Sequence, residues 1–347
     1  MSLVATERSG FGRSGLTRAA AVMAAFAVLS ALMVADLVTG PAGLSLDEVL
    51  RGLQDGPAGS DRRLATILWH LRMPQTLMAA LVGSALGIAG LLMQTILANP
   101  LASPYTLGFS AAAGFGAALV ILFGTALPVA TWIGIPVAAF AATLIAAGLV
   151  QLVARYRGAS PEMLVLAGIA VLFFFQSLQS LLQFMAAPEV LQQIVFWLFG
   201  SLLKATWTSV KVLTAILLLT LPFVLREVWS LTALRLGDGN AASLGLDVAA
   251  LRRRVLVMVA LLTAGAVSFT GTIGFVGLIA PHVGRALVGE DHRFGLPMAG
   301  IMGAIVLVAA SVTGKILSPG AVIPVGIITA VAGIPMLLGV ILMKGRT

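Results

Sequence analysis

Long apolar stretches fill most of this chain, and short polar segments separate them. A membrane-spanning helix needs roughly 20 mostly apolar residues, and about ten stretches approach that length. The pattern therefore predicts an all-α polytopic membrane protein with about ten transmembrane helices. The predicted spans lie near residues 16–39, 75–97, 105–124, 128–153, 162–186, 208–225, 255–271, 275–289, 295–316 and 322–343. The eighth is short, so we expect it to be tilted or to cross only part of the bilayer.

Two polar segments interrupt this pattern in an informative way. Residues 190–206 are too polar for a span and predict an interfacial helix, with Trp197 and Trp207 as anchors at the membrane surface. Residues 234–254, LRLGDGNAASLGLDVAALRRR, predict two short helices broken at Gly245 and followed by three arginines. A polar island of this kind in an apolar chain favours a docking element for a soluble partner.

Small residues recur at a spacing of four in several predicted spans. Ala79, Gly83 and Gly87 follow this spacing in the second span, and Ala299 and Gly303 follow it in the ninth. Such spacing lets helix backbones approach closely, so we interpret it as tight helix packing.

Composition supports the membrane class and narrows the chemistry. Hydrophobic residues make up 59% of the chain and charged residues 10%, with a mean hydropathy of +1.07, whereas soluble domains have about 25% charged residues. The chain has no cysteine, which excludes disulfides and thiolate metal sites. Its three histidines are too scattered in sequence to suggest a metal cluster, so we expect no metal or cofactor on this chain.

The distribution of basic residues predicts an orientation. An even number of spans places both termini on one side, and cytoplasmic segments carry an excess of Arg and Lys. With the N-terminus inside, the cytoplasmic segments hold twice as many Arg and Lys as the outer ones. We therefore expect one transmembrane domain over 1–347, with a cytoplasmic tail at 1–15, an outer loop at 40–74 and a cytoplasmic island at 234–254. The same rule explains the net charge of +8 without nucleic acid.

The predicted spans contain few groups that could couple transport to an ion gradient. Asp36 lies at the end of the first span and Lys211 at the start of the sixth, and neither has an obvious partner in the sequence. The chain also lacks the phosphate-binding pattern GxxxxGK[ST]. If the protein pumps, a separate ATPase must supply the energy through a cytoplasmic contact, for which 234–254 is the candidate.

Four sequence blocks carry a family resemblance. They are GIAGLLMQTILANPLASPYTLG at 87–108, GDGNAASLG at 237–245, GFVGLIAPHVGRALVGEDHR at 274–293 and IPVGIITAVAGIP at 323–335. In this order and spacing they resemble the FecCD-like permeases of ABC importers for ferric siderophores, haem and cobalamin. The resemblance runs from about residue 64 to the C-terminus. It implies a cobalamin-importer-like permease fold, a second permease subunit, two cytoplasmic subunits that bind ATP and Mg²⁺, and a periplasmic substrate-binding protein. The single domain over 1–347 is then a permease domain in a bacterial inner membrane, and the outer loop at 40–74 is periplasmic.

The resemblance also assigns roles to individual residues. The expected ATPase-coupling residues are Gly237, Asp238, Ala241, Leu244, Gly245, Arg252, Arg253 and Arg254, with Asp238 where the family usually has Glu. The expected cytoplasmic gate comprises Asn99, Pro100 and Leu101 together with Ser160, Pro161 and Glu162. The sequence itself predicts a turn at Asn99-Pro100, because proline blocks continuation of the preceding helix. Asp291, His292 and Arg293 are interpreted as a polar loop, with an ATPase contact as the less favoured alternative.

Some positions depart from the family pattern. Gln75 replaces an arginine, and Ser311, Lys315 and Val322 stand where the family often has Asp, Arg and Glu. On the outer side, Arg51, Arg62, Arg63 and Arg72 are candidates for holding carboxylates of a binding protein. The alternative is that these arginines are solvated or pair with the nearby acidic residues.

The sequence thus predicts a non-catalytic permease subunit, a homodimer or near-homodimer, which moves a substrate from periplasm to cytoplasm by alternating access. A ferric siderophore is the preferred substrate, with haem, cobalamin or an oxyanion as alternatives. A secondary transporter driven by an ion gradient is the alternative function. A membrane-embedded enzyme is less favoured still, because the sequence contains no acid–base or metal constellation.

Overall fold

The computed structural model describes residues 3–124, 131–318 and 323–344, with side chains described from residue 15 to residue 335 outside the gaps. Every regular element in these ranges is helical, which confirms the all-α prediction. The elements are α1 (Leu3–Val38), α2 (Leu46–Asp55), α3 (Arg62–Ala65), η1 (Thr66–Arg72), α4 (Met73–Ile96), η2 (Pro104–Leu107), α5 (Phe109–Phe123), α6 (Thr131–Arg157), α7 (Pro161–Met185), α8 (Pro188–Leu198), α9 (Trp207–Arg226), α10 (Val228–Leu234), α11 (Asp238–Ser243), α12 (Val248–Thr270), α13 (Val276–Val288), α14 (His292–Leu317) and α15 (Val325–Lys344). Residues 128–130 of the fourth predicted span and Val322 lie outside the described residues.

The helices match the predicted spans in number and place. Seven helical segments are long and apolar enough to cross a membrane, and three shorter apolar helices, Phe109–Phe123, Val276–Val288 and Val325–Pro335, account for the others. The prediction of a short eighth span is confirmed by α13, which has 13 residues. At 1.5 Å per residue it is about 20 Å long, shorter than a hydrocarbon core of about 30 Å.

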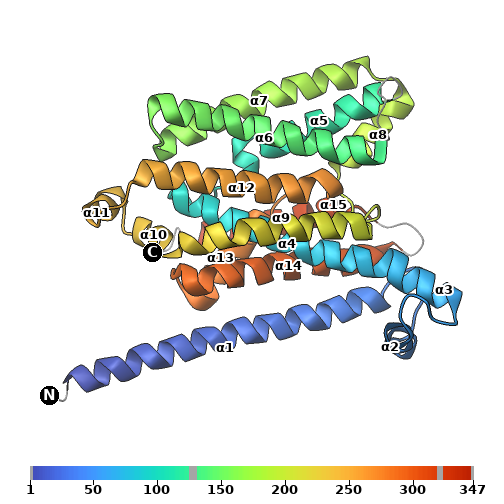
Figure 1. Cartoon of the computed structure of the whole chain (residues 1–347), viewed down its shortest axis with the longest axis horizontal. Coiled ribbons are helices and arrows are strands. Elements are labelled where there is room, and N and C mark those ends of the chain that lie inside the picture. The colour runs from blue at the N-terminus through green and yellow to red at the C-terminus, as the bar shows by residue number, and fades with distance from the viewer. Residues whose placement is uncertain (1–2, 125–130, 319–322, 345–347) are drawn as a thin grey trace.

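The helices run roughly side by side in a flattened bundle (Figure 1). Helices α4, α12, α13 and α14 pack together at the centre, α5 to α8 lie along one side, and α1 lies against α14 on the other. Helices α10 and α11 lie at one end of the bundle, where α1 begins and α15 finishes. Helices α2 and α3 lie at the opposite end. We call these the α11 end and the α2 end.

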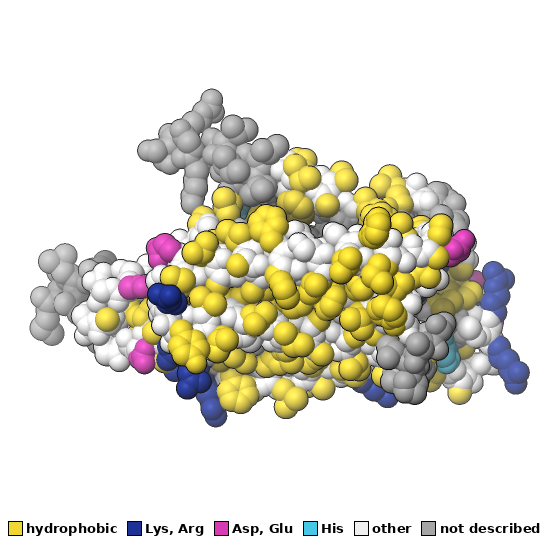
Figure 2. Space-filling model, turned by 90° about the horizontal axis from the view of Figure 1, so that it is seen from above, with side chains coloured by type: hydrophobic (Ala, Val, Ile, Leu, Met, Phe, Trp, Pro, Cys, Tyr) yellow, Lys and Arg dark blue, Asp and Glu magenta, His cyan; other side chains and the backbone are white. Residues whose placement is uncertain are grey.

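The surface has the distribution expected of a membrane protein. Figure 2 shows apolar side chains over the broad middle of the face in view, with the Lys, Arg, Asp and Glu side chains collected toward the two ends. Large apolar side chains such as Phe184, Leu219 and Trp132 are more than two-thirds exposed. An apolar surface of this extent would be unfavourable in water, so it fits contact with lipid.

Close backbone packing joins α4 to α14, as the small-residue spacing predicted. A Cβ atom at Gly83 would lie 2.3 Å from the carbonyl oxygen of Gly303, and one at Gly87 would lie 2.2 Å from that of Ala299. Neither position has room for a methyl group. The backbones therefore touch directly, which confirms the packing interpretation.

The expected tail and outer loop contain helices. Helix α1 already begins at Leu3, so most of the predicted tail at 1–15 is helical. The predicted loop at 40–74 contains α2, α3 and η1, and a continuous helical segment of 35 residues runs from Arg62 to Ile96. At about 52 Å this segment is longer than the hydrocarbon core is thick, so its polar start can extend beyond the membrane surface.

The two polar interruptions also differ in detail from the predictions. The predicted interfacial helix ends at Leu198, and α9 begins with Trp207. The indole of Trp207 donates a hydrogen bond to the carbonyl of Trp69 at 2.8 Å, so it joins two segments of the protein. In the island at 234–254, α11 is the short helix expected before Gly245, but the second short helix is the beginning of the spanning helix α12.

Candidate coupling and gating site

Helix α11 projects from the end of the bundle (Figure 1). Gly237 precedes it with a φ of +97°, and Gly245 follows it with a φ of +83°. The amide of Gly245 donates to the carbonyl of Ala242, and the amide of Leu246 donates to that of Ala241. These two bonds form a Schellman motif, which requires a left-handed residue at the position of Gly245. The predicted break at Gly245 is therefore confirmed, with a specific geometric reason.

Most of α11 faces away from the rest of the chain. Ala241 is the buried residue of this helix and packs into the main core. Leu236 and Leu244, on either side of the helix, are 63% and 65% exposed. A polar helix flanked by two exposed leucines is a suitable surface for a protein partner.

The sequence suggested that Arg252 lies on a docking surface. In the structure its side chain is instead buried next to α11. Its Nη1 and Nη2 atoms donate to the two carboxylate oxygens of Asp238 at 2.7 and 2.8 Å. Its Nε donates to the carbonyl of Ile96 at 2.8 Å, and Nη1 also donates to the carbonyl of Ala159 at 3.3 Å. One guanidinium thus contacts α11, the end of α4 and the segment that precedes α7.

The two neighbouring arginines have different environments. The backbone carbonyl of Arg253 accepts a hydrogen bond from Gln151 of α6. Arg254 is half-exposed and pairs with Glu227 at 2.7 Å. The three arginines therefore do not form one basic surface, and Arg254 is the most exposed of them.

The first predicted gate segment is a compact turn directly after α4. The carbonyl of Asn99 accepts the amide of Ala102, and the Asn99 side chain accepts the amide of Leu101 at 2.9 Å, with Pro100 between them. This confirms the predicted turn. Ala98 precedes it with a φ of +47°, in the left-handed region that a residue with a Cβ atom rarely occupies.

The second predicted gate segment begins α7. Ser160 caps this helix by accepting the amide of Met163 at 3.3 Å, and Pro161 occupies the first helical position. Glu162 follows with an exposed side chain. Through Ile96 and Ala159, Arg252 lies beside both predicted gate segments, which the sequence placed about 60 residues apart without showing that they meet.

His292 is a second buried connection at the α11 end. The structure corrects its assignment to a polar loop, because its side chain is buried at the start of α14. Its Nε2 lies 2.9 Å from the hydroxyl of Thr95 in α4, and its Nδ1 lies 3.3 Å from the hydroxyl of Thr232 in α10. The neighbouring Asp291 is hydrogen-bonded to Arg293, which holds the pKa of that carboxyl below its usual value. No local sequence signal linked His292 to the two threonines.

The four arginines expected on the outer side differ in their exposure to solvent. Arg51, Arg62 and Arg63 are exposed at the α2 end. Arg72 is buried, and its guanidinium donates to the carbonyls of Leu37 and Val38 at the end of α1. Arg72 therefore caps α1 and does not belong to an exposed basic surface.

Asp36, which had no evident partner in the sequence, lies in a buried charged cluster near the α2 end. Lys315 donates to its carboxylate at 2.8 Å, and Thr76 donates to the other carboxylate oxygen. Arg72 is close enough to interact with Asp36 electrostatically. The cluster lies within two residues of the ends of α1 and α14, away from the middle of the bundle, so it does not resemble a proton relay across the membrane.

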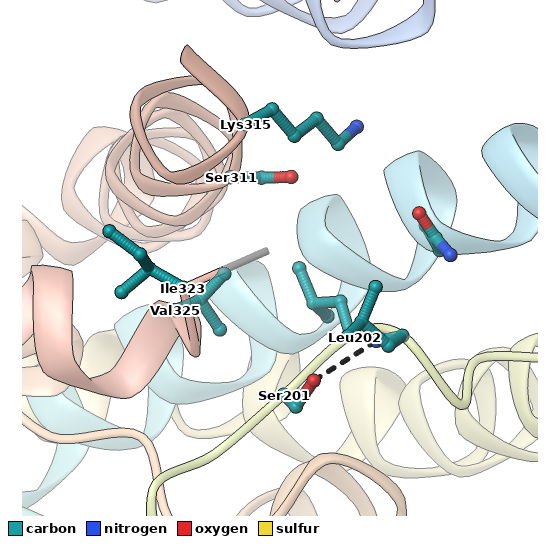
Figure 3. A pocket seen from close by; sticks show the side chains of 8 residues that line it. Ser201, Leu202, Ser311, Lys315, Ile323 and Val325 are labelled. Atoms are coloured by element: carbon teal, nitrogen blue, oxygen red, sulfur yellow. Dashed lines mark hydrogen bonds between the residues drawn. The ribbon is translucent and has the colours of Figure 1, made fainter. Parts of the chain in front are cut away.

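Three positions that depart from the family pattern line one small recess beside this cluster (Figure 3). Gln75, Ser311 and Lys315 line it together with Ser201, Leu202, Leu203, Ile323 and Val325. The changes that looked independent in the sequence are therefore neighbours in space.

The comparisons with known proteins agree with this geometry. Residues 28–344 match the family model of the FecCD transport family. The chain belongs to the FecCD transport family. Its helical, multi-pass architecture is that of a membrane permease, and the family resemblance expected from the four sequence blocks is confirmed.

Several FecCD relatives match over most of the chain. An ABC transporter permease protein of Methanocaldococcus jannaschii is 36% identical over 314 residues, or 88% of this chain and 89% of that protein. The Fe(3+)-citrate import system permease protein of Bacillus subtilis strain 168 is 34% identical, covering 94% and 96% of the two chains. The hemin transport system permease protein of Yersinia pestis is 34% identical, covering 80% and 84%.

A solved structure shares the fold of this FecCD chain. It is described as an inward-facing conformation of a metal-chelate type ABC transporter. The two structures superimpose with a TM-score of 0.82 and 31% sequence identity, covering 93% of this chain and 98% of the other.

Proposed function

We propose that this chain is the membrane-spanning permease subunit of an ATP-driven importer that moves an iron(III) chelate, preferably a ferric siderophore, into the cytoplasm. The relatives named for Fe(3+)-citrate and hemin support this substrate class. Haem, cobalamin and an oxyanion are the other substrates to be tested. The subunit itself holds no cofactor and does no chemistry in this proposal, because ATP and Mg²⁺ bind to a partner ATPase.

The observation that carries the proposal is the arrangement of α11. This six-residue helix projects from an otherwise apolar bundle and is flanked by two exposed leucines. Arg252 joins it to the segments at Asn99 and Ser160. A transporter that receives its energy from a separate ATPase subunit needs a contact surface for that subunit and a rigid connection from this surface to its gate. In the proposed complex, the helix occupies a groove of the ATPase and moves when ATP binding closes that subunit.

The orientation follows from charge. The α11 end carries Arg235, Arg253, Arg254 and Arg293, and the positive-inside rule supports a cytoplasmic location for this end. The α2 end is then periplasmic, where Arg51, Arg62 and Arg63 are available to acidic groups of a substrate-binding protein. Two permease subunits and two ATPase subunits form the core of the proposed complex, with the pathway between the permeases.

Transport by the reconstituted complex tests the proposal. The permease, its ATPase and its binding protein are placed in proteoliposomes, and uptake of radioactive ferric siderophore, ferric citrate, haem, cobalamin and molybdate is measured. We expect uptake of an iron chelate that needs ATP and is blocked by vanadate. Uptake that collapses with an uncoupler at constant ATP would overturn the proposal in favour of a secondary transporter.

A further inference from the structure

Arg252 makes four hydrogen bonds from a nearly buried side chain, and they reach three separate parts of the molecule. We propose that Arg252 is a positioning residue that joins α11 to both segments of the gate, so that a displacement of α11 moves the gate. This inference rests on the proposed function, since it assumes that α11 receives the motion of an ATPase.

The first connection is to α11 itself. Asp238 is the first residue of this helix, and its carboxylate forms a two-pronged pair with the guanidinium of Arg252. The Asp238 side chain is 55% exposed, whereas that of Arg252 is 4% exposed. The pair therefore extends from the proposed docking surface into the bundle. Bidentate pairs of this kind fix direction as well as distance, because the guanidinium is planar.

The second connection is to the end of α4. Ile96 is the last residue of that helix, so its carbonyl has no helical amide to accept from. The Nε atom of Arg252 supplies the missing donor at 2.8 Å. Ala98, which has the strained left-handed backbone, and the turn at Asn99 follow within three residues. Movement of the guanidinium would therefore displace the carbonyl of Ile96 and the start of this turn.

The third connection is to the segment before α7. The carbonyl of Ala159 accepts from Nη1 of Arg252, and Ser160 caps α7 at the next position. The same nitrogen also donates to Asp238. The planar guanidinium cannot keep both contacts if α11 and this segment move independently. The geometry therefore requires that Asp238 and the two carbonyls move together, or that the contacts break.

Neighbouring residues provide matched controls. Arg254 lies two positions away in the same helix and also pairs with a carboxylate, that of Glu227, but its side chain is 52% exposed. Exposed pairs contribute little to stability, and this one contacts neither gate segment in the described hydrogen bonds. Replacing Arg254 removes the same charge from the same helix without removing the connection to Ile96 and Ala159.

The test measures how much substrate is transported per ATP hydrolysed. Arg252→Gln, Arg252→Lys, Asp238→Asn, Asp238→Glu and the double variant Arg252→Gln/Asp238→Asn are compared with Arg254→Gln in proteoliposomes that contain the whole complex. We expect Arg252→Gln to lower the ratio roughly threefold or more while ATP hydrolysis continues. Arg252→Lys should lower it similarly, because an ammonium lacks the planar fork. Asp238→Asn should also lower the ratio, and Asp238→Glu should lower it less than Asp238→Asn, because it keeps a carboxylate. Arg254→Gln should lower the ratio less than Arg252→Gln does, because the connection to Ile96 and Ala159 stays intact.

The double variant separates a specific link from two independent effects. If Asp238 acts through Arg252, the double variant should be no worse than Arg252→Gln alone, because contacting residues are not additive. Additive losses in the double variant would contradict the link. If Arg252→Gln fails to fold, Asp238→Asn carries the test, since it breaks the connection to α11 and leaves the buried arginine in place.

A chemical reporter follows the gate directly. The chain has no cysteine, so Leu101→Cys introduces a single thiol in the turn after α4. We expect its reactivity toward a water-soluble maleimide to change between nucleotide-free and vanadate-trapped complexes, and the change to disappear in the Arg252→Gln background. A persistent change, together with a wild-type transport ratio, would overturn the role of Arg252. Absence of ATP-dependent transport in the wild-type complex would instead overturn the proposed function.

Discussion

Lys315 of α14 donates a hydrogen bond to the carboxylate of Asp36 of α1 at 2.8 Å, across 279 positions of sequence. Both side chains are buried, and Arg72 lies nearby. The cluster therefore contains two cations and one anion. Since little of α1 is buried elsewhere along its span, this cluster is its strongest polar attachment to the bundle among the described contacts.

The charge balance of the cluster predicts an asymmetry between two substitutions. Asp36→Asn leaves Lys315 and Arg72 buried without an anion, whereas Lys315→Met leaves Asp36 with Arg72. Breaking a buried pair costs about 3–5 kcal/mol, and we expect Asp36→Asn to lie at the upper end of this range. Melting temperatures of the purified protein in detergent measure the difference.

The control for this prediction is Lys211→Met. Lys211 was the other charged residue noted in the predicted spans, but it is exposed at the start of α9. Its replacement should change stability by no more than about 0.5 kcal/mol. Equal losses in Asp36→Asn and Lys315→Met would contradict the charge argument.

The sequence predicted those features that depend on neighbours along the chain. The spans follow from runs of apolar residues, the turn at Asn99 from the proline that follows it, and the break after α11 from Gly245. The prediction of a second short helix in the island was wrong, because α12 begins at Val248, about two turns before its apolar part. Local polarity cannot distinguish a separate helix from the polar start of a spanning one.

The sequence could not predict the contacts that helix packing creates. Asp36 and Lys315 meet because α1 lies against α14, and Arg252 reaches Ile96 and Ala159 because α12 packs against α4 and α6. Each of these polar residues looked isolated or surface-exposed in its own segment. Their partners follow from the arrangement of helices, which a residue pattern within one helix does not contain.

Gly83 tests the close contact between α4 and α14. A Cβ atom there would lie 2.3 Å from a backbone oxygen, so Gly83→Ala must push the two helices apart. We expect a loss of about 1–3 kcal/mol in stability, as for other overpacked sites. Thermal unfolding in detergent measures it.

Gly148 of α6 is the matched control, because a Cβ atom there has no heavy atom within 4 Å. Gly148→Ala should be neutral or stabilising, since alanine favours the helix by about 1 kcal/mol over glycine. The contact argument requires that Gly83→Ala destabilises the protein and that Gly148→Ala does not. A stabilised Gly83→Ala protein would contradict it.

Replacing Ala98 with glycine should stabilise the predicted gate turn. Its φ of +47° places it at the left-handed position of the Schellman-type end of α4, where glycine is the usual residue. Ala98→Gly should relieve about 1 kcal/mol of backbone strain and raise the melting temperature. Ala170→Gly, at an exposed position inside α7, should have the opposite effect. A lower melting temperature for Ala98→Gly would show that the turn is not strained.

Gly245 tests the connection between helix geometry and transport. A Cβ atom at this position would have no heavy atom within 4 Å, so a substitution acts through the backbone and not through a clash. Its φ of +83° disfavours a β-branched residue by about 1–2 kcal/mol, whereas asparagine tolerates the left-handed region. We expect Gly245→Val to tilt or unravel the end of α11, so that the reconstituted complex hydrolyses ATP but transports less substrate per ATP, while Gly245→Asn stays close to the wild type. Because both side chains would project into open space, a steric effect on the ATPase surface should affect both variants alike. If both variants transport the same amount of substrate per ATP, the Schellman turn is not needed for the proposed coupling.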